Sequence, residues 1–195
     1  MGDDLPERRR VRDAELLEAL AHPLRAALVR YLMAVGPKTP SECAQNVGSS
    51  ASNCSWHLRQ LARLGLVEPA AATDGRQRPW QACDVGLDLG QLDQDPVVRS
   101  TQLAMVGNAL NEEQALTQRF FDKAGELDPE WLESGGLNTY SLRITSDELA
   151  QLIVDVDALI RPYVGTIRED APAEARTVHV GLRAFPRIEA DGTYQ

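Results

Sequence analysis

Residues 51–63 carry polar side chains at a spacing that would place them on one side of a helix. At about 100° per residue, four apolar positions share the opposite side: Ala51, Cys54, Leu58 and Leu61. The polar side, here called the outer face, comprises Ser52, Asn53, Trp56, Arg59, Gln60 and Arg63. Arginines bind phosphate or guanine, and amides suit adenine edges. The outer face therefore suits nucleic-acid binding, although a solvated helix face would show the same pattern.

Further candidate contacts lie on both sides of this segment. Lys38, Thr39 and Ser41 precede or begin an expected helix, whose free N–H groups suit phosphate. Arg76 and Arg78 flank an expected hairpin tip, from which arginines commonly enter the minor groove or bind phosphate. Polar turns are common without any ligand, so this second assignment has an ordinary alternative. The remaining hydroxyl candidates beside the outer face are Ser50 and Ser55.

Trp56 is unusual because it lies almost opposite the apolar side. An exposed indole is costly unless something covers it. Three arrangements remain open: it packs on a thymine methyl or a sugar, folds back over Arg59 or Arg63, or is simply an exposed aromatic side chain.

The cysteines and histidines argue against metal binding and catalysis. Cys43, Cys54 and Cys83 are too few and too widely spaced for a disulfide framework or a zinc pattern. The sequence has no phosphate-cradling glycine loop and no hydrolase or metalloprotease motif. We therefore expect no enzyme activity and no cofactor. An oxidant-sensing role stays open for Cys43, whereas Cys54 should be an inert buried thiol.

Local signals place these residues in a winged helix-turn-helix. Residues 15–21 and 23–35 read as two helices separated at His22-Pro23. Thr39-Pro40-Ser41-Glu42 is a capping box, and Gly48 ends that short helix. The next helix, capped by Ser49 or Ser50, follows after a short turn, which is the helix-turn-helix arrangement. Extended pieces around Thr73-Asp74-Gly75-Arg76 then predict a hairpin.

Residues 13–84 resemble the ArsR-type winged-helix transcription regulators. The resemblance lies in four consecutive stretches: HPLRAALVRYL, TPSECAQNVG, SSASNCSWHLRQLARLGLVEP and GRQR. The resemblance implies a dimer that binds double-stranded DNA, with dimer contacts from the first helix and from residues 96–127. It also implies that His57 contacts a phosphate or a base edge; a packed or capping histidine is the alternative. The family's metal sites are not matched, because Glu42-Cys43-Ala44 holds one thiol and residues 93–127 hold no histidine.

The second half of the chain predicts a different architecture. Residues 93–127 are predicted to be the long dimerisation helix that the resemblance implies, with residues 96–127 reading as one long helix or two in tandem. Residues 128–187 read as a small strand–helix–strand extension, with strands near 139–144 and 176–185. Residues 1–12 and 188–195 are expected to be tails. The predicted fold class is α+β and mainly helical. The extension would either brace the dimer or leave an inter-domain crevice for a small-molecule effector.

The charge balance qualifies the DNA interpretation. The 195 residues carry a net charge of −9, yet residues 1–80 hold 11 basic and 9 acidic side chains. The first half is thus able to approach phosphates, whereas a protein-interaction module is the alternative that the overall acidity favours. No apolar run is long enough for a membrane span, and no signal peptide is expected. We expect a reduced, cytoplasmic protein.

Overall fold

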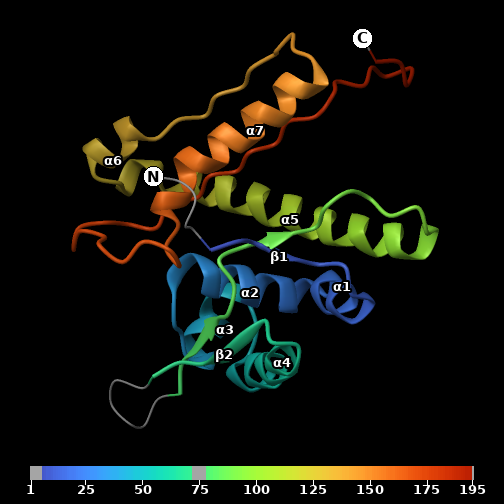
Figure 1. Cartoon of the computed structure of the whole chain (residues 1–195). Coiled ribbons are helices and arrows are strands. Elements are labelled where there is room, and N and C mark those ends of the chain that lie inside the picture. The colour runs from blue at the N-terminus through green and yellow to red at the C-terminus, as the bar shows by residue number, and fades with distance from the viewer. Residues whose placement is uncertain (1–5, 72–77, 195) are drawn as a thin grey trace.

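The computed structural model describes residues 6–71 and 78–194, and it is mainly helical, as predicted (Figure 1). Within these residues the α-helices are α1 (Ala14–Ala21), α2 (Pro23–Val35), α3 (Pro40–Val47), α4 (Ala51–Arg63), α5 (Pro96–Lys123), α6 (Pro129–Ser134) and α7 (Ser146–Ile160). Short 3-10 turns follow α5 (Ala124–Glu126) and α7 (Arg161–Tyr163). The strands are β1 (Arg9–Arg10), β2 (Val67–Pro69), β3 (Trp80–Ala82) and β4 (Leu87–Asp88).

The helix boundaries follow from capping residues. The Asp13 carboxylate accepts the first free N–H groups of α1, and Pro23 begins α2. Thr39 and Glu42 form the predicted capping box of α3, and Gly48 ends this helix in the left-handed conformation at φ 63°. Glycine suits that position because a side chain would be strained there. The turn between α3 and α4 is therefore as short as predicted.

One hydrophobic core joins α1–α4 to β2 and to one residue of α5, Met105. Its fully buried large residues include Leu20, Leu28, Leu32, Leu58, Leu61 and Leu66. Burying one such side chain contributes roughly 1.5–3 kcal/mol. The antiparallel pair β2–β3 lies at the edge of this core, and an isolated bridge between Lys38 and Trp80 connects it to the segment before α3. The core thus fixes α4 against the rest of the domain.

Residues 9–11 are part of the folded domain, so for these residues the prediction of a tail over 1–12 is wrong. β1 pairs in parallel with β4, and Val11 is completely buried in the core. Two residues carry no detectable periodicity, and their partner lies far along the chain. The local sequence therefore contains no signal that predicts β1.

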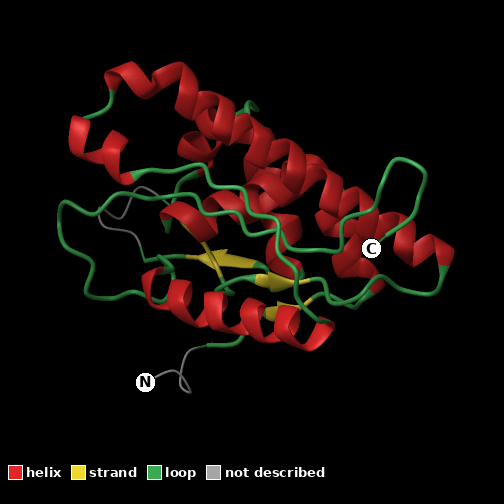
Figure 2. Ribbon diagram, turned by 90° about the horizontal axis from the view of Figure 1, so that it is seen from above, coloured by secondary structure: helices red, strands yellow, loops and turns green. Residues whose placement is uncertain are grey.

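The long helix α5 packs along α1 and α2. Figure 2 shows the molecule from above, with the helices in red and the few short strands in yellow. The Asn108 side chain donates to the Ala21 carbonyl at 2.9 Å, and Arg30 of α2 forms an ion pair with Glu112. These contacts hold α5 against the domain.

Helix α7 forms as predicted, but the two strands expected beside it do not. Thr145 and Glu148 make the predicted capping box of α7. Residues 139–144 and 176–185 have no strand structure, so residues 128–187 do not form the predicted strand–helix–strand unit. A strand requires a neighbour for its backbone hydrogen bonds, and within one chain neither segment finds one.

Candidate nucleic-acid interface

Helix α4 presents the outer face to solvent while its other side is buried. The Ser50 hydroxyl caps the helix by accepting the Asn53 N–H at 3.2 Å. Cys54, Leu58 and Leu61 are fully buried, as expected, whereas Ala51 is exposed and does not belong to the buried side. The prediction that Ala51 is buried is wrong because Ala51 lies in the first turn of α4, beyond the edge of the core. The exposed outer-face residues are Ser52, Asn53, Trp56, Arg59 and Arg63, with Gln60 half-buried.

Hydrogen bonds within α4 hold the polar side chains of the outer face in place. Arg59 donates from Nη1 to the Ser55 hydroxyl at 2.7 Å, and Arg63 donates to Gln60 Oε1 at 3.3 Å. The Asn53 amide donates to the Ser49 hydroxyl at 3.0 Å. Each guanidinium has five N–H donors, so both arginines keep donors for a ligand. The side chains are thus partly ordered before any ligand arrives.

His57 is buried and does not join the outer face. Its side chain is only 7% exposed, its ring lies 4.8 Å from that of His22, and Nδ1 has no hydrogen-bond partner. Burial lowers the pKa of His57, and the nearby His22 and Arg25 lower it further. His57 thus takes the position of a packed histidine, which was the alternative to a ligand contact. Any contact from His57 to a ligand would require local rearrangement.

Trp56 packs edge-on against the His57 ring, with centroids 4.7 Å apart, while its own side chain remains 50% exposed. The indole does not fold over Arg59, whose guanidinium is bonded to Ser55 instead. Two of the three arrangements predicted from the sequence therefore remain: Trp56 packs on a thymine methyl or a sugar, or it is simply an exposed aromatic side chain. An exposed, anchored indole in the middle of the outer face is available to a base or a sugar.

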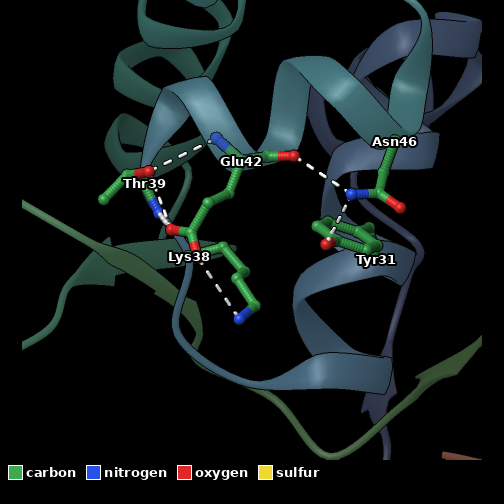
Figure 3. Close-up of polar contacts among 5 residues, drawn as sticks. All are labelled: Tyr31, Lys38, Thr39, Glu42 and Asn46. Atoms are coloured by element: carbon green, nitrogen blue, oxygen red, sulfur yellow. Dashed lines mark hydrogen bonds and ion pairs between the residues drawn. The ribbon is translucent and has the colours of Figure 1, made fainter.

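The start of α3 is already occupied by a carboxylate, as Figure 3 shows. Glu42 Oε2 accepts the Thr39 N–H at 2.8 Å and the Thr39 hydroxyl at 2.7 Å. These hydrogen bonds lower the pKa of Glu42, with a smaller contribution from Lys38, whose Nζ lies 3.4 Å from Oε1. Thr39 is therefore committed to capping, and Lys38 and Ser41 remain as the residues here able to face a phosphate.

The hairpin brings one predicted arginine to this region. Thr39, Ser41, Glu42 and Arg78 line a shallow hollow, and Arg78 is exposed. Arg76 and the turn at 73–76 lie outside the described residues. Arg78 thus adds a cation beside α3, where Glu42 places a negative charge.

Sequence reasoning missed Arg9, which holds the carboxyl end of α4. Its guanidinium donates to the Gly65 carbonyl at 2.6 Å and to the Leu64 carbonyl at 3.0 Å, and it lies 3.3 Å from Asp84 Oδ2. The last carbonyls of a helix lack intrahelical partners and attract cations. Nothing in the local pattern of residues 8–10 distinguishes Arg9 from its two neighbouring arginines.

The thiols do not resemble reactive cysteines. Burial raises the pKa of Cys43 to about 11 and also raises the pKa of Cys54 and Cys83. Thiol chemistry requires the thiolate, so all three are poor nucleophiles at neutral pH. No group of three or more histidine, cysteine or carboxylate side chains is positioned to hold a metal ion in the described part of the chain.

Comparison with protein families identifies one domain. Residues 20–70 match a family described as a helix-turn-helix domain, and this range includes α2, α3, α4 and β2. Over these residues the chain is similar to a helix-turn-helix domain. The match does not distinguish ArsR-type regulators from other helix-turn-helix proteins, so that resemblance remains a prediction. No curated protein matches the sequence.

Three solved structures illustrate what the chain is similar to. The predicted DNA-binding transcriptional regulator from E. coli is 21% identical, with 48% of this chain and 85% of that chain covered and a TM-score of 0.31. Lactococcus lactis ZitR in complex with DNA is 16% identical, with 75% and 77% covered and a TM-score of 0.29. The multiple antibiotic-resistance repressor MarR from Listeria monocytogenes is 12% identical, with 73% and 82% covered and a TM-score of 0.27.

The described helices were also compared with the requirements of a membrane span. None of them is both long enough and apolar enough to cross a bilayer.

Proposed function

We propose that this protein is a dimeric, sequence-specific transcription regulator that binds double-stranded DNA and catalyses no reaction. The observation that carries the proposal is the outer face of α4. It is the exposed side of the second helix of a helix-turn-helix domain, and it combines two guanidinium groups, two amides and a hydroxyl. In such domains the second helix enters the major groove.

The polar groups divide by the contacts that they suit. Arg59, Asn53 and Gln60 have the donors and acceptors needed to read base edges, and Trp56 offers an apolar surface to a thymine methyl. Lys38, Arg63 and Arg78 are suited to phosphates, which position a protein on the duplex without reading its sequence. Arg76 is a further phosphate or minor-groove candidate beyond the described residues.

The net charge of −9 does not contradict DNA binding, because the acidic excess lies outside the helix-turn-helix domain. Residues 1–80 carry a net positive charge, and residues 81–195 carry all of the excess negative charge. A protein-interaction module on the same fold is the second candidate, and the overall acidity supports it. The two differ in salt dependence, because DNA binding releases counterions and weakens steeply with added salt.

We propose that two copies associate through α5. Its exposed apolar side chains Leu103, Val106, Leu110 and Phe121 recur at helical spacing and fall within about 60° of one another. The buried residue Met105 lies on a different side of α5, which packs on α1 and α2. The exposed stripe is thus free to meet a second copy, as expected for a two-fold symmetric regulator that binds two half-sites.

We also propose that a small-molecule effector binds the protein, although neither hollow among the described residues lies at the site predicted for it. Two hollows in the described residues lie at the start of α3 and between α1, α2 and α4. Neither is lined by the extension, which was predicted to leave an inter-domain crevice for the effector. Because the protein would have to meet DNA, we place it in the cytoplasm of its cell.

The proposal is tested by titrating fluorescently labelled DNA from upstream of the protein's own gene. Arg59→Ala should weaken binding by about 1–3 kcal/mol and relax sequence preference at one base pair, because one bidentate contact is lost. Arg119→Ala is the matched control, since it removes the same charge from α5. Equal affinity of wild type and Arg59→Ala would exclude a base-reading role for α4. Binding that is unaffected by salt would favour the protein-interaction module.

A further inference from the structure

Two segments of the extension have the pattern of β-strands but expose their apolar side chains. In residues 139–144 the side chains of Tyr140, Leu142 and Ile144 alternate with polar ones, and in residues 176–185 Val178 and Val180 begin the same alternation. Tyr140 is 77% exposed and Val178 is 63% exposed. Alternation with a period of two predicts a strand with one buried face, yet that face is uncovered in the single chain.

The backbone of the same segments is also unpaired. Both are drawn as extended coil in Figure 1, and no hydrogen bond joins their backbones to each other or to another segment among the described residues. Side chains hold the second segment in place instead. Arg183 Nη2 lies 3.1 Å from Glu113 Oε2 of α5, and Arg176 forms an ion pair with Asp128. A row of free backbone N–H and C=O groups beside apolar side chains is a template for pairing with another chain.

Helix α7 between these segments is equally incomplete. Its apolar stripe comprises Leu149, Leu152, Ile153, Val156, Leu159 and Ile160. None of these residues is buried: Leu149, Val156 and Ile160 are half-buried, and Leu159 is 72% exposed. Helices in proteins draw most of their stability from packing an apolar face. Three consecutive elements thus lack a partner on the same part of the molecule.

The exposed area of the chain indicates how large the missing partner surface is. A compact monomer of 21.4 kDa exposes about 9,100 Å², whereas this chain exposes 14,343 Å². Obligate homodimers bury roughly 1,000–2,500 Å² per copy. The excess of about 5,000 Å² is larger than this whole range, so there is enough exposed surface for a dimer interface that covers the extension as well as the α5 stripe and removes part of the excess.

We propose that residues 139–144 and 176–185 form β-strands by pairing with the extension of a second copy of this chain, which also covers the exposed stripe of α7. The surface is continuous with the α5 stripe, because Glu113, which holds residues 181–183, lies beside Leu110 on that helix. The inference rests on the homodimer in the proposed function and is independent of DNA binding.

The first test is backbone amide hydrogen exchange of the full chain at several protein concentrations, with the oligomeric state measured by light scattering. We expect a dimer in which the amides of residues 139–144 and 177–185 are protected, and protection that is lost on dilution to monomer. A dimer in which these amides exchange as in an unstructured peptide would overturn the proposal. A monomer that protects them would overturn it too, because the strands would then form within one chain.

The second test uses neighbouring residues on opposite faces of each segment. Leu142→Asn should raise the dimer dissociation constant by about 100-fold, because the buried side chain is lost twice per dimer. Arg143→Asn introduces the same residue on the other face and should change it by less than about threefold. Val180→Asn and His179→Asn are the corresponding pair in the second segment. Equal effects within each pair would contradict the proposal.

Measuring DNA affinity on the same variants separates the two hypotheses. If Leu142→Asn dissociates the dimer while wild type binds no DNA, the interaction surface stands and the proposed function fails. If wild type binds DNA and neither member of each pair alters the dimer, the strand pairing fails and the proposed function stands.

Discussion

Replacing Arg9 by methionine should destabilise the helix-turn-helix domain, because Arg9 satisfies the carboxyl end of α4. Methionine keeps the aliphatic length of the side chain and removes its donors and its charge. The two lost hydrogen bonds join the guanidinium to the carbonyls of Gly65 at 2.6 Å and Leu64 at 3.0 Å. The lost ion pair joins it to Asp84 at 3.3 Å.

The expected magnitude follows from these contacts and their exposure. Each hydrogen bond from a charged donor contributes about 1–1.5 kcal/mol net, at the lower end here because water can reach the Gly65 carbonyl. The Arg9 and Asp84 side chains are 29% and 21% exposed, so their ion pair adds at most about 0.5–1 kcal/mol. We expect a total loss of about 2–3 kcal/mol in the free energy of unfolding.

Urea denaturation followed by far-ultraviolet circular dichroism measures this loss. Arg10→Met is the matched control, because the Arg10 side chain is 70% exposed and lies 3.9 Å from its acidic partner Asp88. The control should change the unfolding free energy by less than about 0.5 kcal/mol. If Arg9→Met and Arg10→Met are equally stable, Arg9 does not hold the end of α4 and the reasoning is refuted.

Three further predictions concern pH, salt and metal. The lowered pKa of His57 makes the unfolded state bind a proton more readily, so stability should fall as pH drops below about 6.5. His57→Gln should make the melting temperature less dependent on pH below about 6.5, and an unchanged dependence would contradict the burial argument. Arg78→Ala should weaken binding to all DNA sequences alike and reduce the salt slope by about one; an unchanged slope would remove Arg78 from the interface. The purified protein should hold no stoichiometric zinc, copper or nickel by mass spectrometry, and tight binding of one metal per subunit would contradict this prediction.

The helices were predictable because their signals are local. The Thr39–Glu42 capping box, Gly48 after α3 and Pro23 at the start of α2 each act within one turn of helix. The buried side of α4 followed from spacing alone at Cys54, Leu58 and Leu61. These features depend on neighbours only a few residues away, so a single sequence contains the information.

The missed features depend on residues that are distant in the chain. β1 exists because β4 lies beside it, and the role of Arg9 arises from the end of α4. The sequence left two alternatives open for His57, and the packed one depends on His22, between α1 and α2, whose ring lies 4.8 Å away. The alternation in residues 139–144 predicts a strand correctly only if a partner strand is present, and one chain does not supply it.

Selection from a pool of random double-stranded DNA tests the central claim most directly. If two copies present α4 to the major groove, the selected sequences should contain one motif made of two inverted half-sites about 10–10.5 base pairs apart, centre to centre. Arg59→Ala should lose the preference at one position of each half-site. Recovery of no common motif, with binding no tighter than to unselected DNA, would contradict the claim that this chain is a sequence-specific regulator.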